Sequence, residues 1–319
     1  MRNLKKILAL VLALVMSMSL LATANAFSDD KDIDATYNEA VSVLSGLKVF
    51  EGYENGSFQP KGSITRAEVA AIIYRIVTGD VADNQAGIYK DYAKFKDVAA
   101  NHWAAGYIGY CSNAELILGD GTNFYPDQTV TGYQALAMIL RAVGYDANDE
   151  FTGDGWAIRV ATTAQQLGIL KNVNEATLGA YASRELVAEL IFQAMNVPTV
   201  TYTPAFGYDD DNAFGVKNAT LGEKNFELAF EENTTDDWGR PGNVWYQETS
   251  NWPNGSTRYN GYDKDEDVVY ATIEDECLGT FIEATSDCDI ATAMGVDKVT
   301  PVTVWTNGVE KDDSITPTD

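Results

Sequence analysis

The sequence predicts a mainly α-helical chain built from three repeats and followed by a small, acidic, β-rich region at residues 200–319. One stretch with helical periodicity occurs three times without a gap, at residues 64–77, 130–144 and 182–195. The last region instead shows short runs of alternating apolar and polar residues, separated by turn residues. Periodicity distinguishes helix from strand, and a recurring pattern indicates a modular fold.

The N-terminus has the features of a secretory signal peptide, which we assign to residues 1–26. Three basic side chains precede an apolar run at residues 7–21, and small residues follow at positions 24–26. The run is shorter than the roughly 20 apolar residues that a membrane helix needs. We therefore expect a secreted chain that begins at Phe27 and has no contact with the membrane after cleavage.

The formal net charge of −25 limits the classes of partner. Residues 27–199 contain 22 acidic and 12 basic side chains, whereas residues 200–319 contain 25 acidic and 7 basic ones. A negative field of this size disfavours nucleic acid and anionic lipid as partners. Any anionic ligand must therefore be bound by a few well-placed cations.

Cysteine and histidine usage predicts neither a metal site nor a cofactor. The spacing of the three cysteines excludes a CxxC pattern, and His102 is the only histidine. Unpaired thiols are favoured over a bridge between Cys277 and Cys288, although the spacing leaves that bridge open. The acidic stretch at residues 263–274 resembles a calcium loop, but it lacks the glycine required at the sixth position.

The first repeated helix is expected between Thr65 and Gly79. Thr65 and Glu68 have the spacing of a capping box, in which each satisfies the backbone amide of the other. Gly79 is suited to end the helix, because glycine readily adopts a left-handed conformation. Arg66 has no such local role, since a cation in the first turn faces the positive end of the helix macrodipole. Its position indicates a role outside the helix.

The same pattern predicts helices after Thr131 and Ser183. The positions 4, 7, 8, 11 and 12 residues beyond each N-cap are apolar in all three copies, which gives each helix one apolar face. The glutamate of the first capping box becomes Gln134 in the second copy and Leu186 in the third. The third cap is therefore expected to be weaker.

A further amphipathic helix and a turn-rich loop are expected before each of these helices. The second copy shows this most clearly, with an amphipathic pattern over residues 97–117. We interpret Trp103 in this stretch as mainly core, at the edge of a groove, and His102 as structural. The third copy is degenerate, because its loop at residues 172–179 is short.

These motifs resemble the S-layer homology modules, which are the cell-wall-binding repeats of bacterial surface proteins. The resemblance is carried by "FKDVAANHWAAGYI" and "ILGDGTNFYPDQTVT" in the second copy and by Thr-Arg-Ala-Glu at residues 65–68 in the first. It implies three modules, at residues 27–80, 90–146 and 147–199, the last one degenerate. It further implies a pseudo-threefold helical assembly with ligand grooves between adjacent modules.

The resemblance also implies a ligand, a secondary cell-wall polysaccharide that commonly ends in a pyruvate ketal. An arginine beside a helix N-terminus presents a fork of donors to such a carboxylate. That position is Arg66, Gly132 and Arg184 in the three copies, so we expect Gly132→Ala to matter little for wall binding. The expected ligand-binding residues are Thr65, Arg66, Glu68, Trp103, Ser183 and Arg184.

We therefore expect a non-catalytic protein that anchors itself non-covalently to the Gram-positive cell wall. The acidic region at residues 200–319 has no assigned function, and the chain ends without a sorting signal, as a fragment of a longer protein would. Two alternatives stay open at this point. One is an anchored exoenzyme such as a polysaccharide hydrolase, and the other is a lattice-forming S-layer subunit whose acidic region self-associates.

Overall fold

The computed structural model describes residues 27–211 and 215–229 with their side chains and, beyond them, the backbone of strands only. The predicted signal peptide lies outside these residues. The chain divides into two units, one ending at Phe226 and the other beginning at Glu227. Within the described residues, no helix has the length and apolar character needed to cross a bilayer.

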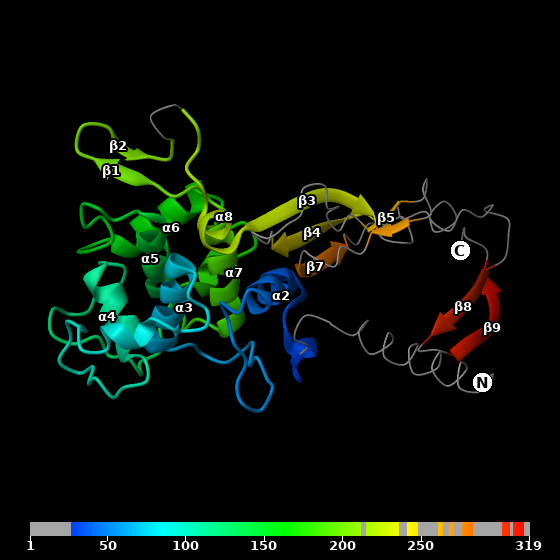
Figure 1. Cartoon of the computed structure of the whole chain (residues 1–319), viewed down its shortest axis with the longest axis horizontal. Helices are drawn as coiled ribbons and strands as arrows, with labels where there is room; N and C mark the ends of the chain where they lie inside the picture. The colour runs from blue at the N-terminus through cyan, green and yellow to red at the C-terminus, as the bar shows by residue number, and fades with distance from the viewer. Residues whose placement is uncertain are drawn as a thin grey trace, which may run out of the picture. The chain divides into compact units, whose positions relative to one another are not determined.

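The described part of the first unit is mainly helical (Figure 1). Its α-helices are α2 (Asn38–Gly46), α3 (Arg66–Thr78), α4 (Ala105–Asn113), α5 (Gly132–Val143), α6 (Trp156–Gln166), α7 (Arg184–Met195) and α8 (Leu221–Phe226). Short 3-10 helices lie at η1 (Asp30–Asp32), η2 (Ala35–Tyr37), η3 (Ala86–Tyr89) and η4 (Glu175–Thr177).

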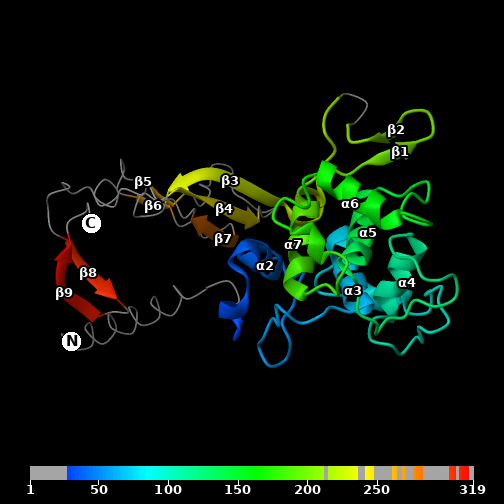
Figure 2. The same cartoon turned by 180° about the vertical axis from the view of Figure 1, so that it is seen from behind.

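The three repeats share one core. The second helices of the repeats lie together, with α3 against α5 and α5 against α7 (Figures 1 and 2). Each first helix packs on the second helix of a different repeat: α4 on α3, α6 on α5, and α2 on α7. Each repeat therefore buries its apolar faces against its neighbours.

A closed cycle of backbone hydrogen bonds joins the extended segments that precede α3, α5 and α7. The Ile64 amide donates to the Ala182 carbonyl at 3.1 Å, and the Ala182 amide donates to the Val130 carbonyl at 2.9 Å. The Val130 amide donates back to the Ile64 carbonyl at 3.1 Å. All three residues are fully buried, so the cycle fixes the N-termini of the three helices beside one another.

The predicted helix ends are confirmed. Capping boxes form at Thr65 with Glu68 and at Thr131 with Gln134. The Ser183 hydroxyl accepts from the amide of Leu186, without the reciprocal bond of a complete box. Gly79 ends α3 with φ of 72°, a left-handed conformation that favours glycine.

The interpretation of Trp103 as a core residue is wrong. Helix α4 begins only at Ala105, and Trp103 lies in the turn before it with 58% of its surface exposed. The helix cannot extend further upstream because Asp97 accepts the amides of Phe124 and Tyr125, at 2.8 and 2.7 Å, and so holds its segment against the loop. Tertiary hydrogen bonding here overrides the helical pattern.

The structure gives Gly132 a packing role that the sequence does not indicate. An added Cβ at Gly132 would lie 2.8 Å from Leu178 Cα and 3.0 Å from the Leu178 carbonyl oxygen. Contacts this short with backbone require a shift of the chain. In the second copy, a neighbouring backbone thus occupies the space where the other copies have an arginine side chain.

After α7, a short hairpin and a short helix complete the first unit. Strand β1 (Thr201–Thr203) pairs antiparallel with β2 (Gly207–Asp209). In α8, the Asn225 side chain donates to the carbonyls of Ile76 and Val77, at 2.8 and 2.9 Å, and so satisfies the C-terminus of α3. One part of the region expected to be β-rich is therefore helical.

The second unit is described through its strands alone. One antiparallel sheet is formed by β3 (Leu228–Thr235), β4 (Pro241–Gln247) and β7 (Glu276–Ile282). Strand β5 (Gly261–Asp263) pairs antiparallel with β6 (Val268–Tyr270). Strand β8 (Val302–Thr306) pairs antiparallel with β9 (Val309–Ile315). The predictions for the acidic loop at residues 263–274 and for Cys277 and Cys288 concern side chains outside the described residues. Cys111 is a buried free thiol.

Candidate functional site

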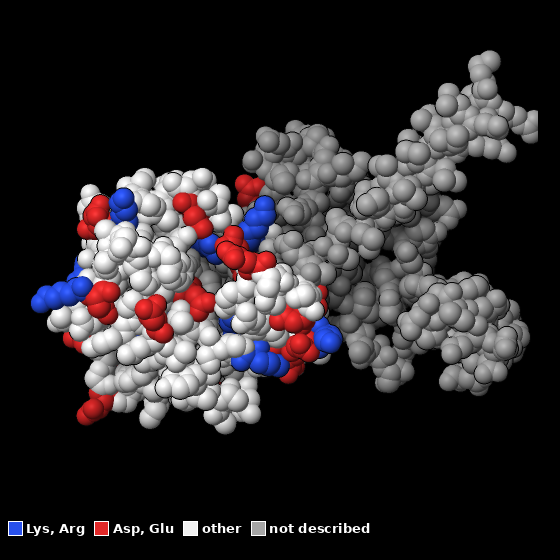
Figure 3. All heavy atoms as spheres, turned by 90° about the horizontal axis from the view of Figure 1, so that it is seen from below, with Lys and Arg blue, Asp and Glu red and all other residues white. Residues whose placement is uncertain are grey.

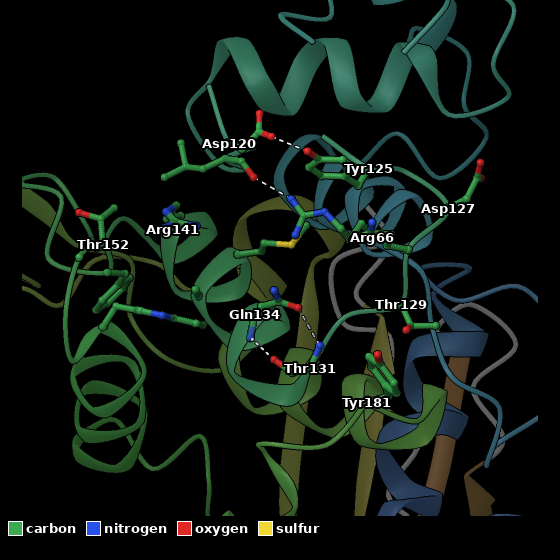
Figure 4. A pocket seen from close by; sticks show the side chains of 18 residues that line it. Arg66, Asp120, Tyr125, Asp127, Thr129, Thr131, Gln134, Arg141, Thr152 and Tyr181 are labelled. Atoms are coloured by element: carbon green, nitrogen blue, oxygen red, sulfur yellow. Dashed lines mark hydrogen bonds between the residues drawn. The ribbon is translucent and has the colours of Figure 1, made fainter. Parts of the chain in front are cut away.

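A pocket of about 930 Å³ lies beside the N-terminus of α5 (Figure 4). Arg66 enters it from the start of α3, and residues 118–129 of the loop before α5 form one wall. Helix α5 contributes the side chains of Thr131, Gln134, Ala137, Met138 and Arg141, and the opposite side is formed by Phe151, Thr152, Gly153, Trp156 and Tyr181. All three repeats therefore contribute to this pocket.

The Arg66 guanidinium is the central charge of the pocket. Its Nε donates to the Phe124 carbonyl at 2.6 Å, and its Nη2 donates to the Leu118 carbonyl at 2.7 Å. The guanidinium also stacks over the Phe124 ring, 4.4 Å from the ring centroid. Burial lowers the pKa of Arg66, yet arginine stays protonated. Within the described residues, no carboxylate lies within ion-pair distance of it.

Arg184 occupies the corresponding position at the start of α7, but its charge is neutralised. Its Nε and Nη2 donate to the carbonyls of Phe58 and Glu51, at 2.8 and 2.9 Å, in the loop before α3. Arg66 makes the equivalent pair of bonds to the loop before α5. Arg184 Nη1, however, lies 3.4 Å from Glu68 Oε1. With 5% of its surface exposed, Arg184 is buried beside the rings of Phe50, Tyr53 and Phe58.

The other charged groups in the pocket are mostly held by protein partners. Arg141 Nε donates to Asp146 Oδ2 at 2.6 Å. The Tyr125 hydroxyl donates to Asp120. This hydrogen bond, together with smaller contributions from the amides of Asn123 and Thr122, lowers the pKa of Asp120 to about 2. Asp120 is therefore ionised at neutral pH and is unsuited to act as a general acid.

Aromatic rings and neutral polar groups complete the lining. Tyr181 is 69% exposed, and Trp156 and Tyr125 also face the pocket. Aromatic faces combined with hydroxyl and amide groups suit a ligand that has apolar faces and polar edges, such as a sugar chain. Among these groups lies Arg66, for which no ion-pair partner is found within the described residues.

One of the six sequence-predicted binding residues, Arg66, lies in this pocket. Thr65 and Glu68 hydrogen-bond to each other, and Ser183 caps α7. Trp103 stacks on His102 and contacts Tyr107 edge to face, outside the pocket lining. The structure brings Arg184 to Glu68 and does not bring the six together.

Sequence reasoning missed several pocket residues, above all Gln134, Arg141 and Tyr181 as ligand-facing groups. A signal for Arg141 was present, because Arg75 and Arg141 both stand ten residues beyond their N-caps. Tyr181 gave no local signal. It reaches the pocket through the antiparallel bridge between Thr131 and Tyr181, which joins two repeats.

The surface gives no sign of a basic patch for a large polyanion on the face shown in Figure 3, where Lys and Arg are interspersed with Asp and Glu. The carboxylates of Asp209, Asp210 and Asp211 lie close together on the first unit. The Lys217 ammonium contacts two of these carboxylates, at 2.8 Å to Asp210 and 3.1 Å to Asp211. Exposed acidic groups of this kind are common without a metal, so the cluster alone does not assign a metal site.

Comparison with known families identifies the modules that surround the Arg66 pocket. Residues 26–70 and 94–136 match the S-layer homology domain. Two stretches of this chain are therefore similar to that domain. They contain Arg66 in the first stretch and the loop and cap of α5 in the second, which are the main components of the pocket.

The relatives include proteins named for the cell surface and for anchoring, and also an enzyme. The chain is 33% identical over 207 residues to a cell surface protein of Thermoanaerobacter kivui, which covers 63% of this chain and 26% of that protein. It is 41% identical over 145 residues to a cellulosome-anchoring protein of Acetivibrio thermocellus, over 42% of this chain and 32% of that protein. An amylopullulanase of Thermoanaerobacterium thermosulfurigenes is 28% identical over 45% of this chain and 8% of its own length.

The S-layer homology modules and these relatives support a secreted, cell-wall-associated protein. The chain spans about a third or less of the length of these relatives. Because the similarity covers only part of each relative, the activities of the whole relatives do not transfer to this chain.

Proposed function

We propose that this chain anchors a surface protein non-covalently to the Gram-positive cell wall by binding a secondary cell-wall polysaccharide. The observation that carries this proposal is Arg66, which lies in a pocket lined by aromatic rings and has no carboxylate partner among the described residues. On a chain of net charge −25, such a cation provides local attraction for an anionic group of the polymer. A carboxylate, as in a pyruvate ketal, fits the arginine fork.

We also infer that residues 147–199 form a third, degenerate module that completes a pseudo-threefold assembly. The closed hydrogen-bond cycle through Ile64, Val130 and Ala182 supports this inference, because each repeat supplies one donor and one acceptor to it. The order in which α2, α4 and α6 pack on α7, α3 and α5 supports it as well.

The other predicted ligand residues take different proposed roles. The position next to Tyr53 corresponds to the Arg66 pocket. There, Glu68 pairs with Arg184 and accepts hydrogen bonds from the hydroxyls of Tyr53 and Thr65. Trp103 is proposed as an exposed aromatic surface for sugar rings. Ser183 is proposed to contribute indirectly, by capping α7, the helix that begins at Arg184.

Non-catalytic anchoring is favoured over an exoenzyme. The carboxylate of Asp120 is held ionised by Tyr125, and the His102 ring accepts from the Ala104 amide at 3.1 Å through Nδ1. Asp120 is therefore unsuited to donate a proton, and His102 is not among the residues that line the Arg66 pocket. A lattice-forming S-layer subunit shares the same anchor, and it would differ in self-association through residues 200–319.

A sedimentation assay with purified Gram-positive sacculi tests the proposal. The purified chain should co-sediment with intact sacculi and lose binding after acid extraction of the secondary polymer. Arg66→Ala should weaken binding by about tenfold or more, equivalent to about 1.4 kcal/mol. Lys90→Ala removes the same charge from an exposed site outside the pocket lining and is the matched control. Undiminished binding to extracted sacculi would reject the polymer as ligand.

A further inference from the structure

The positions of Glu68 and Gln134 decide what each arginine can bind. Both residues occupy the third position of a helix that begins with a threonine cap. Each faces an arginine from another repeat: Glu68 faces Arg184, and Gln134 lines the same pocket as Arg66. At this third helical position the two environments differ by the exchange of one carboxylate oxygen for an amide nitrogen.

The surrounding backbone makes the two positions equivalent. The Arg66 amide donates to the Gln128 carbonyl at 2.8 Å, and the Arg184 amide donates to the Gly62 carbonyl at 2.9 Å. Both carbonyls lie three residues before the threonine cap of the facing helix. A side chain at the third helical position therefore approaches the arginine from the same direction in both cases.

Glu68 uses its two oxygens for different purposes. Oε2 accepts from the Thr65 amide at 2.7 Å and from the Thr65 hydroxyl at 2.8 Å, which completes the capping box. Oε1 faces Arg184 Nη1 at 3.4 Å and accepts from the Tyr53 hydroxyl at 3.0 Å. The protein thereby supplies its own anion to Arg184.

Gln134 has a single oxygen, and the cap uses it. Oε1 accepts from the Thr131 amide at 3.0 Å. The remaining atom, Nε2, is a donor and cannot accept a hydrogen bond from Arg66. Figure 4 shows Gln134 hydrogen-bonded to Thr131, with the Arg66 guanidinium above it. Arg66 Nη2 donates to the Leu118 carbonyl at 2.7 Å. Arg66 and Gln134 therefore both offer donors to the pocket.

We propose that Gln134 determines which position of this protein binds the anionic group of the polymer. Its amide leaves the Arg66 pocket open to an external carboxylate or phosphate, whereas Glu68 occupies the corresponding position at Arg184. The inference rests on the proposed wall-binding function and adds to it: one position is open to an anion and the other is closed by an internal carboxylate.

The decisive variant is Gln134→Glu in the whole chain. A glutamate at this position forms the capping box at least as well as glutamine, and it also complements the helix macrodipole. The variant should therefore fold normally while its second oxygen pairs with Arg66. Binding to intact sacculi should fall by about tenfold or more, and thermal unfolding should show an unchanged or raised midpoint.

Gln166→Glu is the matched control, because it adds the same charge at an exposed position of α6 outside the pocket lining. It should bind as the unmodified chain does. The inference is overturned if Gln134→Glu binds like the control while Arg66→Ala loses binding, and the proposed function then survives. If the unmodified chain fails to bind intact sacculi, the proposed function itself fails.

Discussion

At the scale of single residues, two arginines in matching sequence positions have different roles. Arg184 is buried, donates to two carbonyls and pairs with Glu68. We predict that Arg184→Ala lowers the free energy of unfolding by about 3 kcal/mol, because it leaves a partly buried carboxylate and two carbonyls without their donor. Urea denaturation measures this. Arg66→Ala is the comparison and should cost clearly less, since Arg66 is half-buried. Equal losses would contradict the assignment.

Gly132 gives a second prediction at this scale. Gly132→Ala should lower the free energy of unfolding by about 1–3 kcal/mol, because the new methyl group meets the Leu178 backbone. Gly87→Ala is the control, as nothing lies within 4 Å of its added Cβ. It should be neutral or slightly stabilising. A denaturation midpoint for Gly132→Ala equal to that of Gly87→Ala would show that the loop adapts.

At the scale of elements, α7 combines a predictable apolar face with unpredictable buried charges. Its periodicity predicts the burial of Val187, Leu190 and Ile191, and the structure confirms it. The sequence gives no sign that Glu185 and Glu189 are buried too. Their partners, Lys61 and Asn172, come from distant segments. Helix ends and apolar faces are local properties, whereas these charges depend on tertiary contacts.

The same distinction applies to the candidate site. Arg66 could be predicted because its position breaks a local rule, that of the helix macrodipole. The contribution of Tyr181, and the contrast between Arg66 and Arg184, could not be predicted from local patterns. They follow from which repeat faces which, and from the single acid-to-amide exchange at positions 68 and 134.

The buried Glu189 gives a prediction for α7 that depends on pH. Burial raises its pKa above the ordinary value of 4.5, and nearby Glu39 adds to this, although Gln193, Asn172 and Lys171 oppose it. A raised pKa means that the folded state binds the proton more tightly. Stability from this group is therefore present below pH 4.5 and is lost as the pH rises through the folded pKa.

Glu189→Gln should consequently be more stable than the unmodified chain at pH 7, with a difference that shrinks toward pH 4. The amide oxygen can still accept from Asn172 and Gln193, which both donate to Oε1 at 2.9 Å. Thermal unfolding at several pH values measures the difference. Glu185→Gln is the control and should give no gain at pH 7, because Glu185 pairs with Lys61. A pH-independent difference for Glu189→Gln would contradict the assignment.

At the scale of the whole first unit, the closed hydrogen-bond cycle makes the three repeats depend on one another. The Ile64, Val130 and Ala182 amides are fully buried, and each is bonded to a different repeat. None can reach water unless the contact between two repeats opens, and opening one contact exposes the shared core formed by α3, α5 and α7. The repeats should therefore unfold together.

Amide hydrogen exchange tests this dependence. The amides of Ile64, Val130 and Ala182 should exchange at similarly slow rates, set by the global unfolding of the unit. Amides of the β1–β2 hairpin provide the internal comparison, because these strands pair only with each other among the described residues, and they should exchange faster. If Ala182 exchanged much faster than Ile64 and Val130, the third repeat would open by itself. The two family-matched modules would then have to hold the Arg66 pocket without the Tyr181 wall.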